Sequence, residues 1–407
     1  MHRLLGFRPR AQTRPHSMVV SCRADARIAQ AVTDRFADPA SSRSNPKIAD
    51  TSRETSMSAS IASHLVADGN FGPSITYDRI MQTAMGFWAS KVLLSAVELN
   101  VFGVLASGPL DVIGLRQRLN IHPRSARDFL DALVAQGLLQ RDLAGNYSNS
   151  DEAARFLDPA QPDYIGGIIE MFNTRLYGFW GSLTEALRTG DPQNEAKHGG
   201  DLFEGVYADS TRLEGFLRGM TGITTPVANA LTKVFPWRDV GSVADIGTAQ
   251  GCVPVRLARA HPHLTVTGFD LPPVKPIFSR FVASHGLSDR ARFVAGDFFQ
   301  DALPAADVLI MGMILHDWDL ATKRMLIGKA HTALPPGGTL IVCEMMIDDE
   351  RRAHLPGMLM SLNMLIETRG GFDFTSADCA SWMREAGFST RCVAALAGPY
   401  SAVIGTK

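Results

Sequence analysis

The sequence predicts an α/β protein in which a mainly helical N-terminal domain precedes a seven-stranded, mostly parallel β-sheet. Two observations lead to this prediction. From about residue 240 onward, short β-type segments alternate with helical patterns, and such alternation produces a parallel sheet with helices on both faces. Before that point, residues 75–235 show mainly helical periodicity. A length of 407 residues also exceeds one ordinary domain and agrees with two.

The composition and charge exclude several classes of protein. The chain has 40 Lys and Arg against 41 Asp and Glu, a formal net charge of −1, which is no whole-chain basic field for nucleic acid. Its five cysteines form no Cys-x-x-Cys pair, which argues against a disulfide framework or a zinc ribbon and favours a reducing, cytoplasmic location. No apolar run approaches the roughly 20 residues of a membrane span. We therefore expect no metal, nucleic-acid or membrane partner.

Residues 1–56 differ in composition from the rest of the chain. They are rich in Ser, Pro and Arg and have no lasting hydrophobic period, so they cannot bury enough apolar surface to offset the entropy of ordering. Two interpretations stay open: a disordered leader, or a start codon assigned too early, with translation beginning at Met57. An organelle transit peptide is less favoured, because acidic residues are spread through the segment.

Residues 75–160 are predicted to form the first folded domain. Within 75–106, apolar residues at helical spacing are so numerous that the helix is apolar nearly all round, which requires burial on most faces. A partner subunit is a natural source of the second burying surface, so we expect a homodimer. The central stripe consists of Ile80, Ala84, Trp88, Val92, Ala96 and Leu99.

A winged-helix pattern lies within this domain, over residues 109–147. It comprises a short helix, a longer helix and two short strands, at 114–119, 125–136, 138–140 and 145–147. One interpretation is DNA binding through the longer helix. Its exposed face carries Asp128 and Asp131 beside Arg124 and Arg127, whereas a groove-reading helix is expected to be more basic. We therefore favour a structural or dimerising role.

Residues 161–235 are predicted to be helices and loops that link the two domains. They contain the densest aromatic cluster of the chain, which includes Phe172, Tyr177 and Trp180. Two interpretations stay open for these side chains: packing in a core, or the wall of a pocket for an aromatic substrate.

The second domain is predicted to span residues 236–407. Its strands are expected at 242–246, 265–270, 291–295, 308–313 and 339–344, with a last pair near 389–396 and 400–406. In sheets of this kind, ligands bind at the carboxyl ends of the strands.

A glycine-containing turn directly follows the first of these strands. Asp245 stands near the end of that strand, and Gly247 and Gly251 let the backbone approach a ligand closely. Dinucleotide enzymes set such a turn against a pyrophosphate, which the carboxylate of Asp245 would repel. The acid instead suits a ligand with a cationic amine and no phosphate. S-adenosylmethionine has both properties.

Two further acids follow the next two strands. Asp270, followed by Leu271, is placed to accept the protons of ribose hydroxyls, although NAD enzymes use an acid at the same place. Asp297 is placed to accept from the adenine amino group, with Phe298 stacking on the ring. The alternative for Asp297 is a cap of the next turn. Three acids at three consecutive strand ends predict a site for S-adenosylmethionine.

His316 follows the fourth strand and is the candidate general base. An imidazole with its ordinary pKa of about 6.5 is largely neutral at pH 7, so it can take a proton from a phenol, whose pKa is about 10. Two acids are candidates to support it: Glu344 at the end of the fifth strand, and Asp373 in a later loop. A carboxylate bonded to the other ring nitrogen fixes the tautomer and stabilises the cation that forms.

Together these residues resemble the small-molecule O-methyltransferases of the caffeic acid and acetylserotonin type, over roughly residues 75–407. The segment 245–251 resembles the family's Asp-x-Gly-Gly-Gly-x-Gly loop. Four other segments also match, at 270–272, 296–298, 315–318 and 334–338. The segment 370–375 departs from the family's Gly-Gly-x-Glu-Arg-Thr, because Asp373 replaces Glu and Phe374 replaces Arg.

The resemblance implies a Rossmann-like methyltransferase domain, S-adenosylmethionine as cofactor, and a winged-helix domain that forms a homodimer. We further expect Met311 at the cofactor, and Met220, Trp318 and Asn363 in the substrate pocket.

The sequence therefore predicts an S-adenosylmethionine-dependent O-methyltransferase that acts on a hydroxyl of a hydrophobic, aromatic small molecule. His316 is the expected base. One alternative is methylation of carbon or nitrogen by the same fold. Another is a winged-helix DNA-binding regulator. A nicotinamide oxidoreductase is disfavoured by Asp245.

Overall fold

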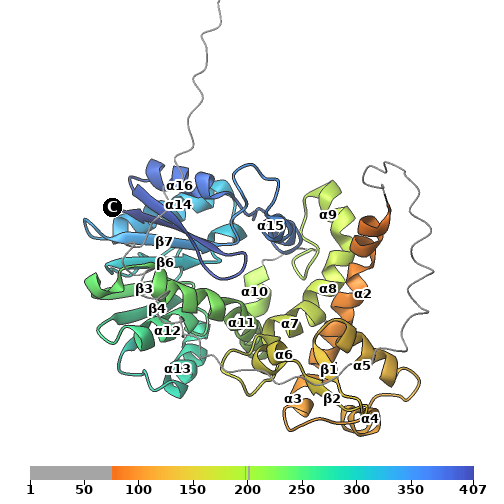
Figure 1. The fold of residues 1–407 in the computed structure, drawn as a ribbon. Coiled ribbons are helices and arrows are strands. Elements are labelled where there is room, and N and C mark those ends of the chain that lie inside the picture. The colour runs from red at the N-terminus through yellow and green to blue at the C-terminus, as the bar shows by residue number, and fades with distance from the viewer. Residues whose placement is uncertain (1–75, 198, 200–201) are drawn as a thin grey trace, which may run out of the picture. The chain divides into compact units, whose positions relative to one another are not determined.

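The computed structural model describes residues 76–197, 199 and 202–407 (Figure 1). Contacts divide them into two compact units, and the chain passes from one to the other between Ala89 and Ser90, inside the first described helix. The predictions for residues 1–56 lie outside the described residues. The unit that begins at Ser90 holds the sheet and the candidate site.

The helical pattern predicted over 75–106 forms two helices. Helix α2 (Asp78–Glu98) and helix α3 (Val101–Leu105) are separate, because Asn100 between them adopts a left-handed conformation with a φ of 57°. An α-helix cannot continue through such a residue. Beyond Ser90, helix α2 buries Leu94, Ala96 and Val97.

The winged helix predicted over 109–147 is present in the structure. Helix α4 (Val112–Leu119) begins where the Asp111 carboxylate accepts a hydrogen bond from the Gly114 backbone N–H at 2.8 Å. Helix α5 (Ala126–Ala135) follows, and strand β1 (Leu139–Arg141) pairs antiparallel with strand β2 (Tyr147–Asn149). The two strands lie one or two residues later in the sequence than predicted.

A run of mostly short helices links this domain to the sheet. They are α6 (Asp151–Phe156), α7 (Gly166–Met171), the π-helical turn η1 (Phe172–Leu176), α8 (Tyr177–Phe179), η2 (Trp180–Ser182), α9 (Leu183–Thr189), α10 (Leu202–Tyr207) and α11 (Ser210–Val234). The long helix α11 packs against α7 and against α12 (Cys252–Ala260) of the second domain.

Glycines set the distance between α7 and α11. A Cβ atom added at Gly222 would lie 3.3 Å from the Ile165 carbonyl oxygen, and one at Gly219 would lie 3.4 Å from the Gly167 carbonyl oxygen. The two backbones therefore approach more closely than larger residues would allow.

The second domain is a seven-stranded sheet in the order β5-β4-β3-β6-β7-β9-β8. The first five strands are parallel, and β9 is antiparallel to both β7 and β8. The strands are β3 (Ser242–Ile246), β4 (Thr265–Asp270), β5 (Ala291–Ala295), β6 (Val308–Gly312), β7 (Thr339–Glu344), β8 (Ser389–Ala395) and β9 (Ser401–Thr406). The predicted sheet is confirmed. Strand β6 ends one residue early because Met313 has a φ of 55°.

Helices cover both faces of this sheet (Figure 1). Helices α11, α12 and α13 (Lys275–Ser284) contribute to the core on one face, and α14 (Leu320–Ala333) and α16 (Ser376–Glu385) contribute to the core on the other. The single turns η3 (Trp237–Asp239), η4 (Pro272–Val274) and η5 (Leu315–Asp317) and the helix α15 (Leu355–Glu367) complete the domain. Within the described part of the chain, no helix is long and apolar enough to cross a membrane.

The packing of the winged helix predicts that truncating one buried side chain lowers the stability of the fold strongly. Leu130 is fully buried in the core of this domain. We expect Leu130→Ala to lower the free energy of unfolding by about 2–5 kcal/mol in urea titrations, because it removes apolar contacts and leaves a cavity. Arg127→Ala on the same helix is the control, since its side chain is 72% exposed and its ion pair with Asp131 lies at the surface. Equal effects of the two substitutions would contradict this packing.

Candidate active site

A cavity of about 480 Å³ opens at the carboxyl ends of the parallel strands, between them, helix α11 and helix α15. Its lining is largely apolar. The sequence-predicted residues that line it are Phe172, Met220, Asp245, Gly247, Asp270, Leu271, Asp297, Phe298, His316, Trp318 and Asn363. Residues far apart in the sequence therefore meet at the edge of the sheet where ligands were expected.

The other predicted residues lie around the cavity without lining it. They are Tyr177, Trp180, Gly251, Met311, Glu344 and Asp373. Met311 is fully buried in the core shared with α14, because successive residues of a strand face opposite sides of the sheet. Its neighbours Ile310, Gly312 and Met313 line the cavity instead, which corrects the expected position of Met311.

The turn after β3 is built on left-handed backbone conformations. Gly247 has a φ of 72° and Gly251 a φ of 92°, which L side chains rarely adopt. Space is also restricted at Gly251, where a Cβ atom would lie 2.6 Å from the ring of Phe278. Ala249 occupies the same region with a φ of 52°, although it has a side chain. The turn is therefore held in a strained form.

Asp270 holds this turn in place. Its carboxylate accepts hydrogen bonds from the backbone N–H of Ala249 at 2.9 Å and of Leu271 at 2.8 Å, and from the hydroxyl of Tyr207 at 3.3 Å. Burial raises the pKa of Asp270 to about 6, against these three bonds. The acid expected at the ribose therefore also fixes the glycine turn.

Asp245 is a buried carboxylate whose surroundings suit a cationic ligand. Burial raises its pKa to about 7, because the charged form has lost its water, and the nearby Asp270 acts in the same direction. A ligand ammonium beside it would offset this cost. The residues present thus fit the aminoacyl end of S-adenosylmethionine, and the assignment of Asp245 to that group stays a prediction.

Asp297 and Phe298 contribute to the wall at the end of β5. The Asp297 carboxylate accepts from the Phe299 backbone N–H at 2.8 Å, so the capping interpretation is correct for one of its oxygens. Phe298 and Phe299 both meet the ring of Trp318 edge to face, at centroid distances of 5.9 and 4.8 Å. The three rings form one aromatic wall of the cavity.

His316 lies on η5 with acids on both sides of its ring. Its Nδ1 is 3.5 Å from Asp373 Oδ1 and 3.7 Å from Glu344 Oε2, and its Nε2 is 3.6 Å from Asp317 Oδ1. The other Glu344 oxygen accepts from the backbone N–H groups of Ile314 and Leu315 at 3.1 and 3.0 Å. Glu344 therefore fixes the turn that carries the imidazole.

The same acids change the protonation of His316. Desolvation lowers its pKa, but the negative charges of Glu344, Asp317 and Asp373 outweigh this and raise the pKa to about 10. The expectation of an unperturbed pKa is therefore corrected, since it left out the charges of Glu344 and Asp373 from two other segments and of Asp317 in the same turn. One ligand atom from each of His316, Glu344 and Asp373 lies within 4.8 Å of the other two, a spacing that could hold a metal ion. The expectation that the protein binds no metal therefore stays a prediction.

Lys323 is a member of this region that sequence reasoning missed. It is fully buried on α14, where its ammonium lies 3.5 Å from the ring centroid of Phe372 and donates to the Trp318 carbonyl oxygen. Desolvation lowers its pKa to about 8. In the sequence it looks like an ordinary helix-surface lysine, because its contact with Phe372, 49 positions later in the chain, arises only in the fold.

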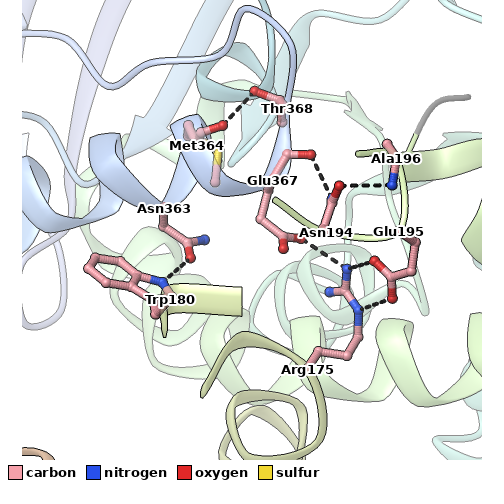
Figure 2. A network of polar contacts seen from close by, with 9 residues as sticks. All are labelled: Arg175, Trp180, Asn194, Glu195, Ala196, Asn363, Met364, Glu367 and Thr368. Atoms are coloured by element: carbon pink, nitrogen blue, oxygen red, sulfur yellow. Dashed lines mark hydrogen bonds and ion pairs between the residues drawn. The ribbon is translucent and has the colours of Figure 1, made fainter. Parts of the chain in front are cut away.

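A second polar network joins η1, η2 and α15 at the cavity (Figure 2). The indole N–H of Trp180 donates to Asn363 Oδ1 at 2.9 Å. Arg175 forms ion pairs with Glu195 and Glu367 at 2.7 and 3.1 Å. Arg175, Asn363 and Glu367 line the cavity, and sequence reasoning predicted only Asn363 among them.

The aromatic cluster of the linking segment divides between the two interpretations left open. Phe172 lines the cavity, and Trp180 orients Asn363. The ring of Tyr177, by contrast, lies 5.4 Å from the ammonium of Lys91 on α2 and does not line the cavity.

The fold and this edge of the sheet define a class of enzyme: an S-adenosylmethionine-dependent methyltransferase. Residues 180–389 match the O-methyltransferase domain family, and residues 81–159 match the O-methyltransferase dimerisation domain. The chain therefore belongs to the O-methyltransferase family.

Two relatives and one solved structure show how close this membership is. The chain is 44% identical over 328 residues to the tetracenomycin polyketide synthesis 8-O-methyl transferase TcmO of Streptomyces glaucescens, which covers 81% of this chain and 96% of that protein. It is 37% identical over 270 residues to the N,N-dimethyltransferase OxyT of Streptomyces rimosus, covering 66% and 78%. Human N-acetylserotonin methyltransferase in complex with SAM has a TM-score of 0.76 at 27% identity, covering 83% and 99%.

The glycine turn predicts a selective loss of cofactor binding. We expect Gly251→Ala to weaken binding of S-adenosylhomocysteine at least tenfold in calorimetry, because a Cβ atom would collide with Phe278 and displace the turn. Gly190→Ala is the matched control. Gly190 has a similar φ of 76°, but no atom lies within 4 Å of the added carbon. If both variants lost affinity equally, general backbone strain would be the cause.

Proposed function

We propose that this enzyme transfers a methyl group from S-adenosylmethionine to a hydroxyl of a hydrophobic, aromatic small molecule, with His316 as general base. The observation that carries the proposal is the position of His316. Its imidazole lines the same largely apolar cavity as Asp245, Asp270 and Asp297, and acids stand behind its Nδ1. The base and the cofactor residues thus face one space.

The walls of the cavity support an aromatic acceptor. Phe172, Met220 and Trp318 present apolar side chains to it, and Asn363 adds a polar group. Flat rings stack well against such walls, and a few fixed polar groups set their orientation. The relative TcmO, an 8-O-methyl transferase of tetracenomycin polyketide synthesis, is consistent with an acceptor of this type.

The proposed mechanism uses His316 and the two acids at its Nδ1. S-adenosylmethionine, when bound, supplies an electrophilic methyl group. The Nε2 of neutral His316 takes the acceptor's hydroxyl proton as the oxygen becomes a nucleophile. Glu344 and Asp373 orient the ring and stabilise the imidazolium that forms. The raised pKa of His316 is close to that of a phenol. The free-energy change for moving the proton from the phenol to the imidazole is therefore close to zero.

Two further assignments belong to the same proposal. A homodimer is supported by the match to the O-methyltransferase dimerisation domain over residues 81–159 and by the apolar pattern of the first helix. Methylation of nitrogen is the second candidate function, because the relative OxyT is an N,N-dimethyltransferase. A nitrogen acceptor would leave His316 with a shaping role only.

Removal of the base separates these functions. We expect His316→Ala to keep its affinity for S-adenosylhomocysteine and to lose about 10²–10⁴-fold in turnover of a hydroxyl acceptor, since general-base catalysis contributes on that scale. His122→Ala serves as the control, because that histidine is exposed on the winged-helix domain. Unchanged turnover in His316→Ala would remove the base assignment, and an N-methylated product would favour the second function.

The pH profile tests the acids at Nδ1. Because the pKa of His316 is raised to about 10, its neutral fraction grows with pH, and we expect kcat/KM to rise from pH 6 to pH 9. Glu344→Gln removes a negative charge beside the ring, so the pKa of His316 falls and this rise moves to lower pH. The Gln oxygen can still accept from the Ile314 and Leu315 N–H groups. An identical profile in the variant would show that Glu344 does not tune the base.

A further inference from the structure

We propose that Arg175 and Glu367 form a recognition subsite for a neutral hydroxyl or carboxamide on the acceptor, apart from the hydroxyl that is methylated. This inference rests on the proposed function, because it places a second polar group of the same aromatic acceptor in the same cavity. Both residues line that cavity together with His316, and neither was predicted as a site residue.

The first observation is that one donor atom and one acceptor atom of the Arg175–Glu367 ion pair have no hydrogen-bond partner within the described ranges. Arg175 uses Nε and Nη2 on Glu195, at 2.9 and 2.7 Å, and Nη2 also reaches Glu367 Oε2 at 3.1 Å (Figure 2). Within the described ranges, Arg175 Nη1 and Glu367 Oε1 are buried and have no hydrogen-bond partner. Buried polar atoms are nearly always paired, so we take these two atoms as the hydrogen-bonding positions of the proposed subsite.

The second observation is the charge of the cluster. One guanidinium stands between two carboxylates, so the cluster carries a net charge of −1 when both acids are ionised. Burial raises the pKa of Glu367 to about 7, and its protonated form would leave a net charge of zero. Neither state offers spare positive charge to an anion. The subsite therefore disfavours a carboxylate on the acceptor.

The chemistry of the two free atoms selects the ligand group. A hydroxyl accepts from Arg175 Nη1 and donates to Glu367 Oε1 at the same time, and a carboxamide can do likewise. An ether or a ketone only accepts. Asn363 adds a third fixed group, because the Trp180 indole holds its carbonyl oxygen at 2.9 Å and leaves its amide nitrogen to donate.

A purely structural role for the Arg175–Glu367 pair is less favoured by its neighbours. The segment that carries Glu195 is already tied to α15 by other bonds. The Gln193 backbone N–H donates to the Ile366 carbonyl at 2.8 Å, and the Asn194 side chain donates to the Glu367 carbonyl at 2.8 Å. These bonds use the backbone of α15, so they do not need the Glu367 carboxylate.

The test compares acceptors that differ by one group. A naphthol, the isomeric dihydroxynaphthalenes and the isomeric hydroxynaphthoic acids are assayed with S-adenosylmethionine. Their dissociation constants are measured in parallel with S-adenosylhomocysteine present. In the natural enzyme we expect the best diol to have a kcat/KM and an affinity at least tenfold higher than those of the naphthol. The hydroxynaphthoic acids should have a lower kcat/KM and a lower affinity than the naphthol.

Three variants locate this preference. Glu367→Ala is expected to bring the ratio of the kcat/KM for the diol to that for the naphthol close to one. Glu185→Ala is the control: it removes a carboxylate from an exposed ion pair with Lys197 and does not line the cavity, so the ratio should persist. Glu367→Gln is expected to raise the kcat/KM and the affinity for the hydroxynaphthoic acids relative to those for the naphthol, because it removes negative charge and keeps the shape of the side chain.

The outcomes distinguish this inference from the proposed function. Methylation of the naphthol without any preference for a diol, or an equal loss for all acceptors in Glu367→Ala, would overturn the subsite and leave the function intact. A binding preference for the diol that Glu367→Ala abolishes, without O-methylation of any acceptor, would support the subsite and overturn the function. Failure of every diol to bind would overturn the subsite.

Discussion

Buried negative charge at the carboxyl edge of the sheet is the constraint on which the site depends. Asp270 and Glu344 end two of the parallel strands, Asp245 is the last residue but one of a third, and all three are almost fully buried. A carboxylate in such a place is costly unless hydrogen bonds or cations compensate it. The protein compensates Asp270 and Glu344 with backbone N–H groups of the turns beside them, and Glu344 also with His316. Among the described residues, Asp245 has no such backbone bonds, and burial outweighs the Thr248 hydroxyl in setting its raised pKa.

The same compensation links catalysis to folding. The bonds that stabilise Asp270 also shape the glycine turn, and those that stabilise Glu344 also shape the turn that carries His316. Lys323 adds a third connection, because it joins the Trp318 carbonyl to the ring of Phe372, next to Asp373. The position of the His316 ring therefore depends on charged groups around it as well as on the cavity walls.

Sequence reasoning predicted what local patterns encode. The strands follow from alternation with helices, and the acids at their ends follow from position, so β3, β4, β5 and β7 have the predicted bounds and Asp245, Asp270 and Asp297 meet at one edge. It failed where distant segments combine. The pKa of His316 depends on Glu344 and Asp373 from distant segments as well as on its neighbour Asp317, and Arg175 meets Glu367 from 192 positions away. Met311 was expected at the cavity, but its side chain points to the other face of the strand, and its neighbours Ile310 and Gly312 line the cavity instead.

The glycine contacts between α7 and α11 bear on how acceptor size could evolve. Phe216 and Met220 line the cavity from α11, while Gly219 and Gly222 of the same helix lie against the backbone around α7. The close contacts of these two glycines therefore help to set where α11 lies at the cavity. A larger residue at either position would displace α11 and change the space for an acceptor. Selection for bulkier or slimmer acceptors can thus act on positions that no acceptor touches.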